Sequence, residues 1–157
     1  RILSSHLHSE GKHAEELSLI GPSTNRWVPE IIEANDPEDI SYYPYMNGQF
    51  VFKNAVVRFE QVILEGLKKN NLSTEDIDLL IPHQANLRIS QFVQRKFGLK
   101  DGQVYNNIEK YGNTTAASIP IALTEAWESG LINTGDKIVL AAFGSGFTWG
   151  SIILNWQ

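Results

Sequence analysis

The stretch that decides the fold covers residues 79–97 and reads LLIPHQANLRISQFVQRKF. Its first three residues form a short apolar run that Pro82 ends, and such a run predicts a buried strand. From residue 86 onward, apolar side chains recur at three- and four-residue spacing until Gly98. This spacing predicts an amphipathic helix over residues 86–97 with a glycine at its C-terminus. A buried strand that turns directly into a helix is typical of an α/β sheet.

The same alternation of helix and strand continues on both sides of this stretch. The other predicted elements are helices over residues 48–70 and 114–129 and strands over residues 1–8, 104–105, 137–143 and 147–156. Residues 21–45 are interrupted by prolines, and their apolar residues follow neither the helical nor the strand spacing. This pattern predicts a long loop. We therefore expect one α/β domain over residues 1–157, in which helices pack on a mixed sheet of about five strands.

The composition is that of an ordinary globular domain of 157 residues, of which 42% are hydrophobic and 20% charged. The chain contains no cysteine, which excludes disulfides, zinc–cysteine sites, iron–sulfur clusters and thiol nucleophiles within it. Its apolar runs are far shorter than the roughly 20 residues of a membrane span, so we expect no helix that crosses a membrane. It also has no glycine-rich phosphate loop of the dinucleotide or P-loop type.

The charge is unevenly distributed. The formal net charge is −5, but residues 81–100 hold Arg88, Arg95, Lys96 and Lys100 and no acidic residue. A local basic face on a mildly acidic protein favours a specific acidic partner over nucleic acid, which usually binds a broad basic field. The alternative is a helix face that is merely solvated.

His83 follows the predicted buried strand and lies close to the start of the next helix. Open α/β sheets bind ligands at this edge, beyond the carboxyl ends of parallel strands. The positive end of the helix dipole disfavours an imidazolium, so a neutral His83 ring can donate a hydrogen bond to a developing oxyanion. The alternative is a histidine that caps its helix or packs without a chemical role.

Two further loops carry polar groups out of apolar elements. The segment YGNTTAAS, residues 111–118, places Asn113 before a predicted helix, where its amide either caps that helix or polarises a carbonyl without adding charge. The segment FGSGFTWG, residues 143–150, contains a glycine-bounded turn. Backbone N–H groups of such a turn can form an oxyanion hole, although tight hairpins also favour glycine. Together the three loops supply neutral hydrogen-bond donors and no nucleophile.

The remaining histidines are weak candidates for a metal site. His6, His8 and His13 have no nearby acidic residues at a recognised metal-ligand spacing, so surface or strand-lining roles are expected for them. We expect neither a metal nor a cofactor in this chain.

Three motifs closely resemble the C-terminal half of β-ketoacyl-acyl-carrier-protein synthase III: PHQANLR at residues 82–88, YGNTTAAS at 111–118 and GSGFTWG at 144–150. The resemblance implies one half of a thiolase-like fold, so that residues 1–157 form the C-terminal domain of a longer cytoplasmic enzyme. The nucleophilic cysteine then belongs to an N-terminal half that this sequence does not contain. Enzymes of this family initiate fatty acid synthesis by decarboxylative Claisen condensation of acyl-CoA with malonyl-acyl-carrier protein, and they usually form homodimers.

The resemblance also implies roles for individual residues. His83 and Asn113 are expected to be the catalytic pair that hydrogen-bonds the malonyl thioester carbonyl, and the backbone N–H of Ser145 is expected to join the oxyanion hole. Family members often have only glycine in that turn. The residues expected to line the pantetheine channel are Gly48, Phe52 and Asn86, and those expected to dock the acidic carrier protein are Lys53, Arg88, Arg95 and Lys96. Without the cysteine, the isolated chain is expected to be inactive.

Two other interpretations remain open. Another ketosynthase of the thiolase superfamily, which uses a polyketide or secondary-metabolite starter, shares the same histidine and asparagine. A non-catalytic module that binds the carrier protein is the alternative from a different functional class. Hydroxymethylglutaryl-CoA synthases are less favoured, because their site resembles Cys/His/Glu and this chain has Asn113.

Overall fold

The computed structural model describes residues 1–19 and 43–157. The predicted loop at residues 21–45 lies outside the described residues, apart from its last three positions. Among the described helices, none is both long enough and apolar enough to cross a membrane.

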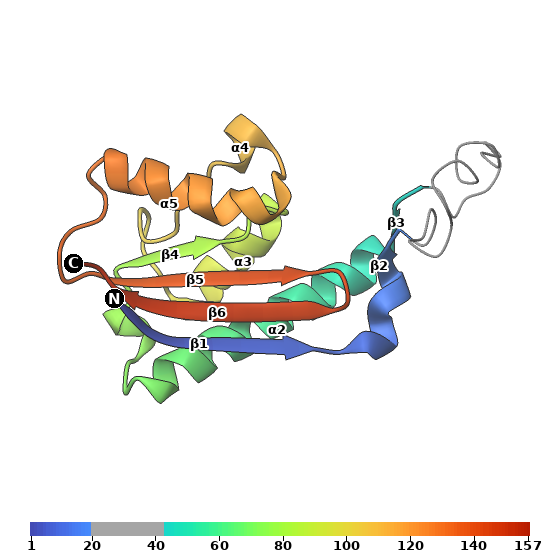
Figure 1. Ribbon diagram of the computed structural model, residues 1–157, viewed down its shortest axis with the longest axis horizontal. Coiled ribbons are helices and arrows are strands. Elements are labelled where there is room, and N and C mark those ends of the chain that lie inside the picture. Colours follow the sequence, from blue (N-terminus) through green and yellow to red (C-terminus); the bar gives the residue numbers. More distant parts are fainter. Residues whose placement is uncertain (20–42) are drawn as a thin grey trace.

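A four-stranded mixed sheet forms the centre of the described structure (Figure 1). Its order is β1 (Ile2–Ser9), β6 (Thr148–Asn155), β5 (Lys137–Gly144) and β4 (Leu79–Pro82). β6 pairs antiparallel with both of its neighbours, and β4 pairs parallel with β5. The α/β class and the mixed sheet are thus confirmed. The expected fifth strand at residues 104–105 is reduced to one parallel bridge between Val104 and Leu80, so the described sheet has four strands.

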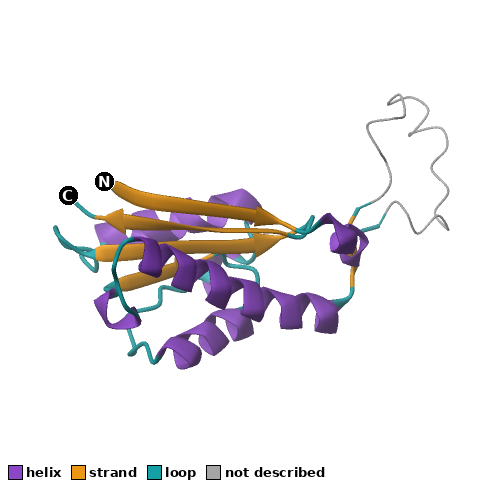
Figure 2. Cartoon of the chain, turned by 90° about the horizontal axis from the view of Figure 1, so that it is seen from below, coloured by secondary structure: helices purple, strands orange, loops and turns teal. Residues whose placement is uncertain are grey.

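Helices cover both faces of this sheet (Figure 2). α2 (Gly48–Lys69) and α3 (Leu87–Phe97) pack on one face and α5 (Ser118–Glu128) on the other. Successive side chains of β4 point to opposite faces of the sheet. Leu80 therefore belongs to the larger apolar core with α2 and α3, whereas Leu79 and Ile81 join the smaller core with α5.

The predicted helix at residues 86–97 is confirmed as α3, and its ends follow from local chemistry. Asn86 is the N-cap: its Oδ1 accepts a hydrogen bond from the Arg88 backbone N–H at 2.9 Å. Gly98 ends the helix with a φ of 65°, a conformation that glycine adopts without steric penalty. These two caps set where α3 begins, immediately beyond the loop that carries His83.

The predicted helix at residues 114–129 is divided in the structure. A short 3₁₀ turn, η4 (Thr115–Ala117), precedes α5, and the N-cap position of α5 is Ala117. Thr115 has a φ of 52°, which is rare for a β-branched residue and interrupts the regular helix. Asn113 is therefore not the N-cap of α5, which corrects one of its two sequence-based interpretations.

The remaining elements are short and lie outside the main sheet. α4 (Ile108–Tyr111) is a single turn between the Val104 bridge and Asn113. The others are η1 (Gly11–Glu16), η3 (Thr74–Asp76) and the two-stranded pair β2 (Leu17–Ser18) and β3 (Tyr45–Met46). Four residues are too few for a helical period to be recognised, so α4 was not predicted from the sequence.

Candidate active site

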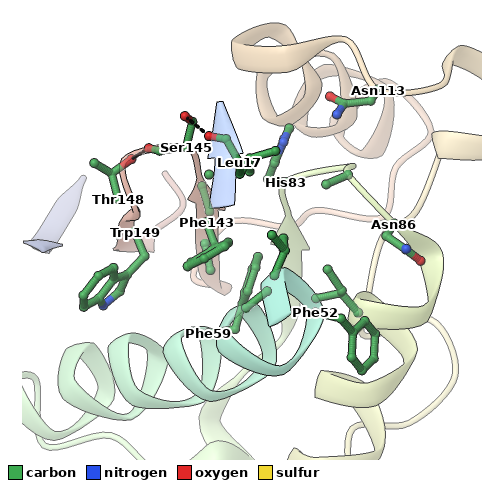
Figure 3. Close-up of a pocket in the computed structure, with 18 of the residues that line it drawn as sticks. Leu17, Phe52, Phe59, His83, Asn86, Asn113, Phe143, Ser145, Thr148 and Trp149 are labelled. Carbon is green, nitrogen blue, oxygen red and sulfur yellow. Dashed lines mark hydrogen bonds between the residues drawn. The ribbon is translucent and has the colours of Figure 1, made fainter. Parts of the chain in front are cut away.

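An open cavity of about 1660 Å³ lies beyond the carboxyl ends of β4 and β5 (Figure 3). Its floor is apolar and includes Phe59 and Phe143. Eight of the ten site residues predicted from the sequence line it: Gly48, Phe52, Lys53, His83, Asn86, Arg88, Asn113 and Ser145. The fold therefore brings together three loops that are far apart in the sequence, and it adds the N-terminal turns of α2 and α3.

His83 is held from below by the sheet and from the side by α5. Its backbone N–H donates to the Ala141 carbonyl of β5 at 2.7 Å, which confirms its predicted place at the end of a parallel strand. Its Nδ1 lies 2.6 Å from Oγ of Ser118, which is only 2% exposed. Burial lowers the pKa of His83 below its usual value, so the ring remains neutral to lower pH than an exposed imidazole.

Ser118 is the side-chain hydrogen-bond partner of the His83 ring, and it accepts a second hydrogen bond from the backbone. The Gln84 backbone N–H donates to Oγ of Ser118 at 3.3 Å, and the serine hydroxyl hydrogen can in turn be donated to Nδ1 of His83. In that arrangement the imidazole proton is on Nε2, and Nε2 becomes a donor for a ligand in the cavity. In the sequence, Ser118 stands out only as the last residue of the YGNTTAAS motif. No local pattern links it to a histidine 35 positions away.

Asn113 presents an uncharged amide to the cavity from a second loop. Its Oδ1 accepts a hydrogen bond from the Thr115 backbone N–H at 2.9 Å, so its Nδ2 group remains as the donor. Figure 3 shows the polar end of Asn113 pointing toward the side of the cavity on which His83 lies. The cavity thus has two neutral N–H donors that come from different loops.

Ser145 occupies the turn between β5 and β6. Its hydroxyl donates to the Leu17 carbonyl at 2.6 Å, and Thr148 Oγ1 donates to the Ser145 carbonyl at 2.8 Å. In this turn Gly146 has a positive φ of 123°, whereas Ser145 is not among the positive-φ residues. A side chain at position 145 therefore needs no strained backbone, and the serine ties the turn to the segment before residue 20.

The four basic residues expected to dock a carrier protein are all at least partly exposed but do not form one cluster. Lys53 and Arg88 line the cavity. Arg95 and Lys96 lie in the last turn of α3, about 10 Å further along its axis at 1.5 Å per residue. Lys96 Nζ is also 3.4 Å from Glu60 Oε1 on α2. Of these four residues, only Lys53 and Arg88 are therefore close to the candidate site.

The other histidines make contacts within the fold. His6 Nδ1 and His8 Nε2 lie 3.3 Å and 2.6 Å from the carboxylate of Glu65 on α2, and the His13 ring packs against Phe50. Over residues 1–19 and 43–157, no three metal-ligating side chains converge. The strand-lining role expected for His6 and His8 agrees with these contacts.

Comparisons with known proteins identify the family. The family described as "3-Oxoacyl-[acyl-carrier-protein (ACP)] synthase III C terminal" matches residues 67–156. A β-ketoacyl-[acyl-carrier-protein] synthase III of Clostridioides difficile is 45% identical over 99% of the chain, and that of Rhodospirillum centenum is 44% identical over the same share. These alignments cover 46% and 44% of the two relatives, so the chain spans less than half of their length.

Solved structures give the same result. The synthase III structure from Thermus thermophilus matches with a TM-score of 0.85 and 38% identity, over 99% of this chain and 46% of that one. The structure from Aquifex aeolicus matches with a TM-score of 0.83 and 38% identity, over 99% and 44%. The thiolase-like half-fold expected from the resemblance is thereby confirmed.

Proposed function

The chain belongs to the 3-oxoacyl-[acyl-carrier-protein] synthase III family and corresponds to the C-terminal half of its members. On this premise we propose an activity for the protein that contains the chain. The protein joins an acyl group from acyl-CoA to malonyl-acyl-carrier protein by decarboxylative Claisen condensation, the step that initiates fatty acid synthesis. It acts in the cytoplasm. This chain supplies the decarboxylation half of the site, and an N-terminal half supplies the nucleophilic cysteine.

The observation that carries the proposal is a pair of neutral donors, His83 and Asn113, at one cavity. When the carbon–carbon bond to the malonyl carboxylate breaks, carbon dioxide leaves and the electron pair moves onto the thioester carbonyl as an enolate. Nε2–H of His83 and Nδ2–H of Asn113 stabilise that oxygen. A cationic imidazolium would instead pair with the carboxylate and stabilise the reactant, so neutrality favours loss of carbon dioxide.

The same enolate completes the condensation. Its carbon attacks the acyl thioester on the cysteine, a carbon–carbon bond forms, and the tetrahedral oxyanion collapses as the thiolate leaves. The backbone N–H of Ser145 is well placed to serve that oxyanion, because its turn borders the cavity. Gly48, Phe52 and Asn86 line the same cavity and are suited to hold the pantetheine arm.

Two features of the surface indicate binding partners: basic residues at the border of the cavity and exposed apolar residues on β1. Lys53 and Arg88 make the cavity border basic, which fits the acidic carrier protein. The edge strand β1 exposes Leu7 and Ile2, at 82% and 63% of their surface, and Leu7 also lines the cavity. Apolar surface of this kind is typical of an interface, so we assign it to the N-terminal half. From the family alone, we further propose that the intact protein is a homodimer.

The experiment uses the intact protein with malonyl-acyl-carrier protein and a panel of acyl-CoA starters. His83→Ala and Asn113→Ala should each lower decarboxylation by about 10²- to 10³-fold and leave acyl transfer to the cysteine in place. Asn133→Ala, exposed in the turn before β5, is the matched control. The isolated 157-residue chain should form no ketoacyl product.

Three results would overturn parts of the proposal. Unchanged decarboxylation in both variants would remove the assigned roles of His83 and Asn113. An intact protein that binds malonyl-acyl-carrier protein but accepts no acyl-CoA would be a carrier-binding module. A preference for starters of secondary metabolism would place it in another ketosynthase group.

A further inference from the structure

Glu125 lies in α5, outside the group of residues predicted from the sequence to form the site. Its carboxylate receives hydrogen bonds from three side chains of one short segment. Asn107 Nδ2 donates to Oε2 at 2.7 Å, and both Lys110 Nζ, at 2.5 Å, and the Tyr111 hydroxyl donate to Oε1. One side chain therefore holds the N-cap and the last turn of α4 together.

α4 needs such support because it has only four residues. A single helical turn fixes several backbone dihedrals for one or two hydrogen bonds and is not stable alone. Its N-terminal end has a second anchor: the Asn107 backbone N–H donates to Gln84 Oε1 at 3.1 Å. Gln84 is 3% exposed and also donates from Nε2 to the Pro82 carbonyl at 2.8 Å, so the segment is tied to the loop that carries His83.

The far end of α4 leads directly to Asn113. The Gly112 backbone N–H donates to the Ile108 carbonyl at 2.7 Å, and Asn113 is the next residue. α5 therefore contacts both halves of the candidate site: Ser118 at its first position contacts His83, and Glu125, about two turns later, holds the segment before Asn113.

We propose that Glu125 is a positioning residue that fixes α4, and through it the place of the Asn113 amide relative to His83. The inference rests on the proposed function, because the relative position of His83 and Asn113 affects the rate only if both residues bind the same enolate oxygen. A misplacement of about 1 Å at a reacting group is enough to lower a rate by about a hundredfold.

The carboxylate stays charged in the working range of the enzyme. Donation by Lys110, Tyr111 and Asn107 lowers the pKa of Glu125 to about 2, and the same contacts raise the pKa of Lys110. The three hydrogen bonds to the Glu125 carboxylate therefore keep a charged acceptor at mildly acidic and neutral pH, and changes of pH near neutrality do not break them.

The test is Glu125→Gln in the intact protein, which removes the negative charge and leaves one side-chain oxygen for the three donors. Decarboxylation of malonyl-acyl-carrier protein should fall roughly tenfold to a hundredfold, while acyl transfer from acyl-CoA to the cysteine stays within about twofold. The double variant Asn107→Asp/Glu125→Gln exchanges donor and acceptor and should recover part of the loss. Glu128→Gln, exposed on the same helix, is the matched control.

Hydrogen exchange provides a readout that does not require catalysis. Backbone amides of residues 112–117 should exchange faster in Glu125→Gln than in Glu128→Gln, and the double variant should restore their protection. If exchange at these amides matches the control, the proposal is wrong, whatever the activity. The proposal would also be wrong if Glu125→Gln lowered decarboxylation and acyl transfer equally and lowered the melting temperature as well, because that result indicates a general loss of stability. An unmodified protein that does not decarboxylate would refute the proposed function alone, because the exchange comparison would still decide the role of Glu125.

Discussion

Nδ1 of His83 lies 2.6 Å from Oγ of Ser118, the first residue of α5. The contact joins a loop at the end of β4 to a helix that packs on the opposite side of the sheet from α3. Because Ser118 is almost fully buried and also accepts the Gln84 N–H, it holds the ring in one orientation, and donation of its hydroxyl hydrogen to Nδ1 favours the tautomer with the proton on Nε2. The behaviour of His83 therefore depends on a residue that never touches the substrate in the proposed reaction.

Ser118→Ala should remove the hydrogen bond that orients the His83 ring. The imidazole loses its partner on Nδ1, so the proton distributes between the two nitrogens, and condensation by the intact protein should fall roughly tenfold or more. The ¹⁵N chemical shifts of the His83 ring report the tautomer directly. Ser129→Ala, at the exposed end of α5, is the control. Identical ring shifts in wild type and Ser118→Ala would contradict the assignment.

The lowered pKa of His83 should appear in the pH dependence of stability. The unfolded imidazole takes up a proton as the pH falls through about 6.5, whereas the folded ring resists protonation until lower pH. The contribution of His83 is thus fully present above that value and is lost as the pH falls below it. Urea unfolding of the chain between about pH 7.5 and pH 5.5 should show a smaller decrease in unfolding free energy for His83→Gln than for wild type. Parallel curves would argue against a depressed pKa.

Arg88→Glu should separate the two substrates of the intact protein. Arg88 lines the cavity, so charge reversal should raise KM for malonyl-acyl-carrier protein by about tenfold and affect transfer from acyl-CoA less. Arg95→Glu, at the other end of α3, should have a smaller effect, and Lys69→Glu at the end of α2 should have almost none. Equal losses with both substrates for Arg88→Glu would count against docking.

Gly150→Ala should loosen the edge of the sheet. A Cβ at this position would lie 2.6 Å from Leu7 Cδ2 and 2.8 Å from the His6 carbonyl oxygen, so β1 would have to move away from β6. The expected loss of unfolding free energy is about 1–3 kcal/mol, as for overpacked cores. Denaturant unfolding measures it, with Gly11→Ala as the control, because a methyl group added there would have no neighbouring atom within 4 Å. A loss no greater than that of the control would show that β1 adapts freely.

The sequence predicted the elements whose signals are local. The strand before Pro82, the helix over residues 86–97 and its end at Gly98 each depend on a few neighbouring residues, and the structure confirms all three. His83 could be placed at the edge of a parallel strand for the same reason. The division of the helix at residues 114–129 was missed, because the φ of 52° at Thr115 has no signature in hydrophobic spacing.

The sequence by itself determined the α/β class, the order of the main elements and the three polar loops, since period, caps and glycines act over one or two turns of chain. Only the tertiary structure decided how those loops meet. The contacts of Ser118 with His83, of Glu125 with α4 and of Ser145 with Leu17 join residues that are 35, 14 to 18 and 128 positions apart. Hydrogen bonds of this kind form between groups that packing of the sheet and α5 brings together, so no periodic pattern in the chain encodes them.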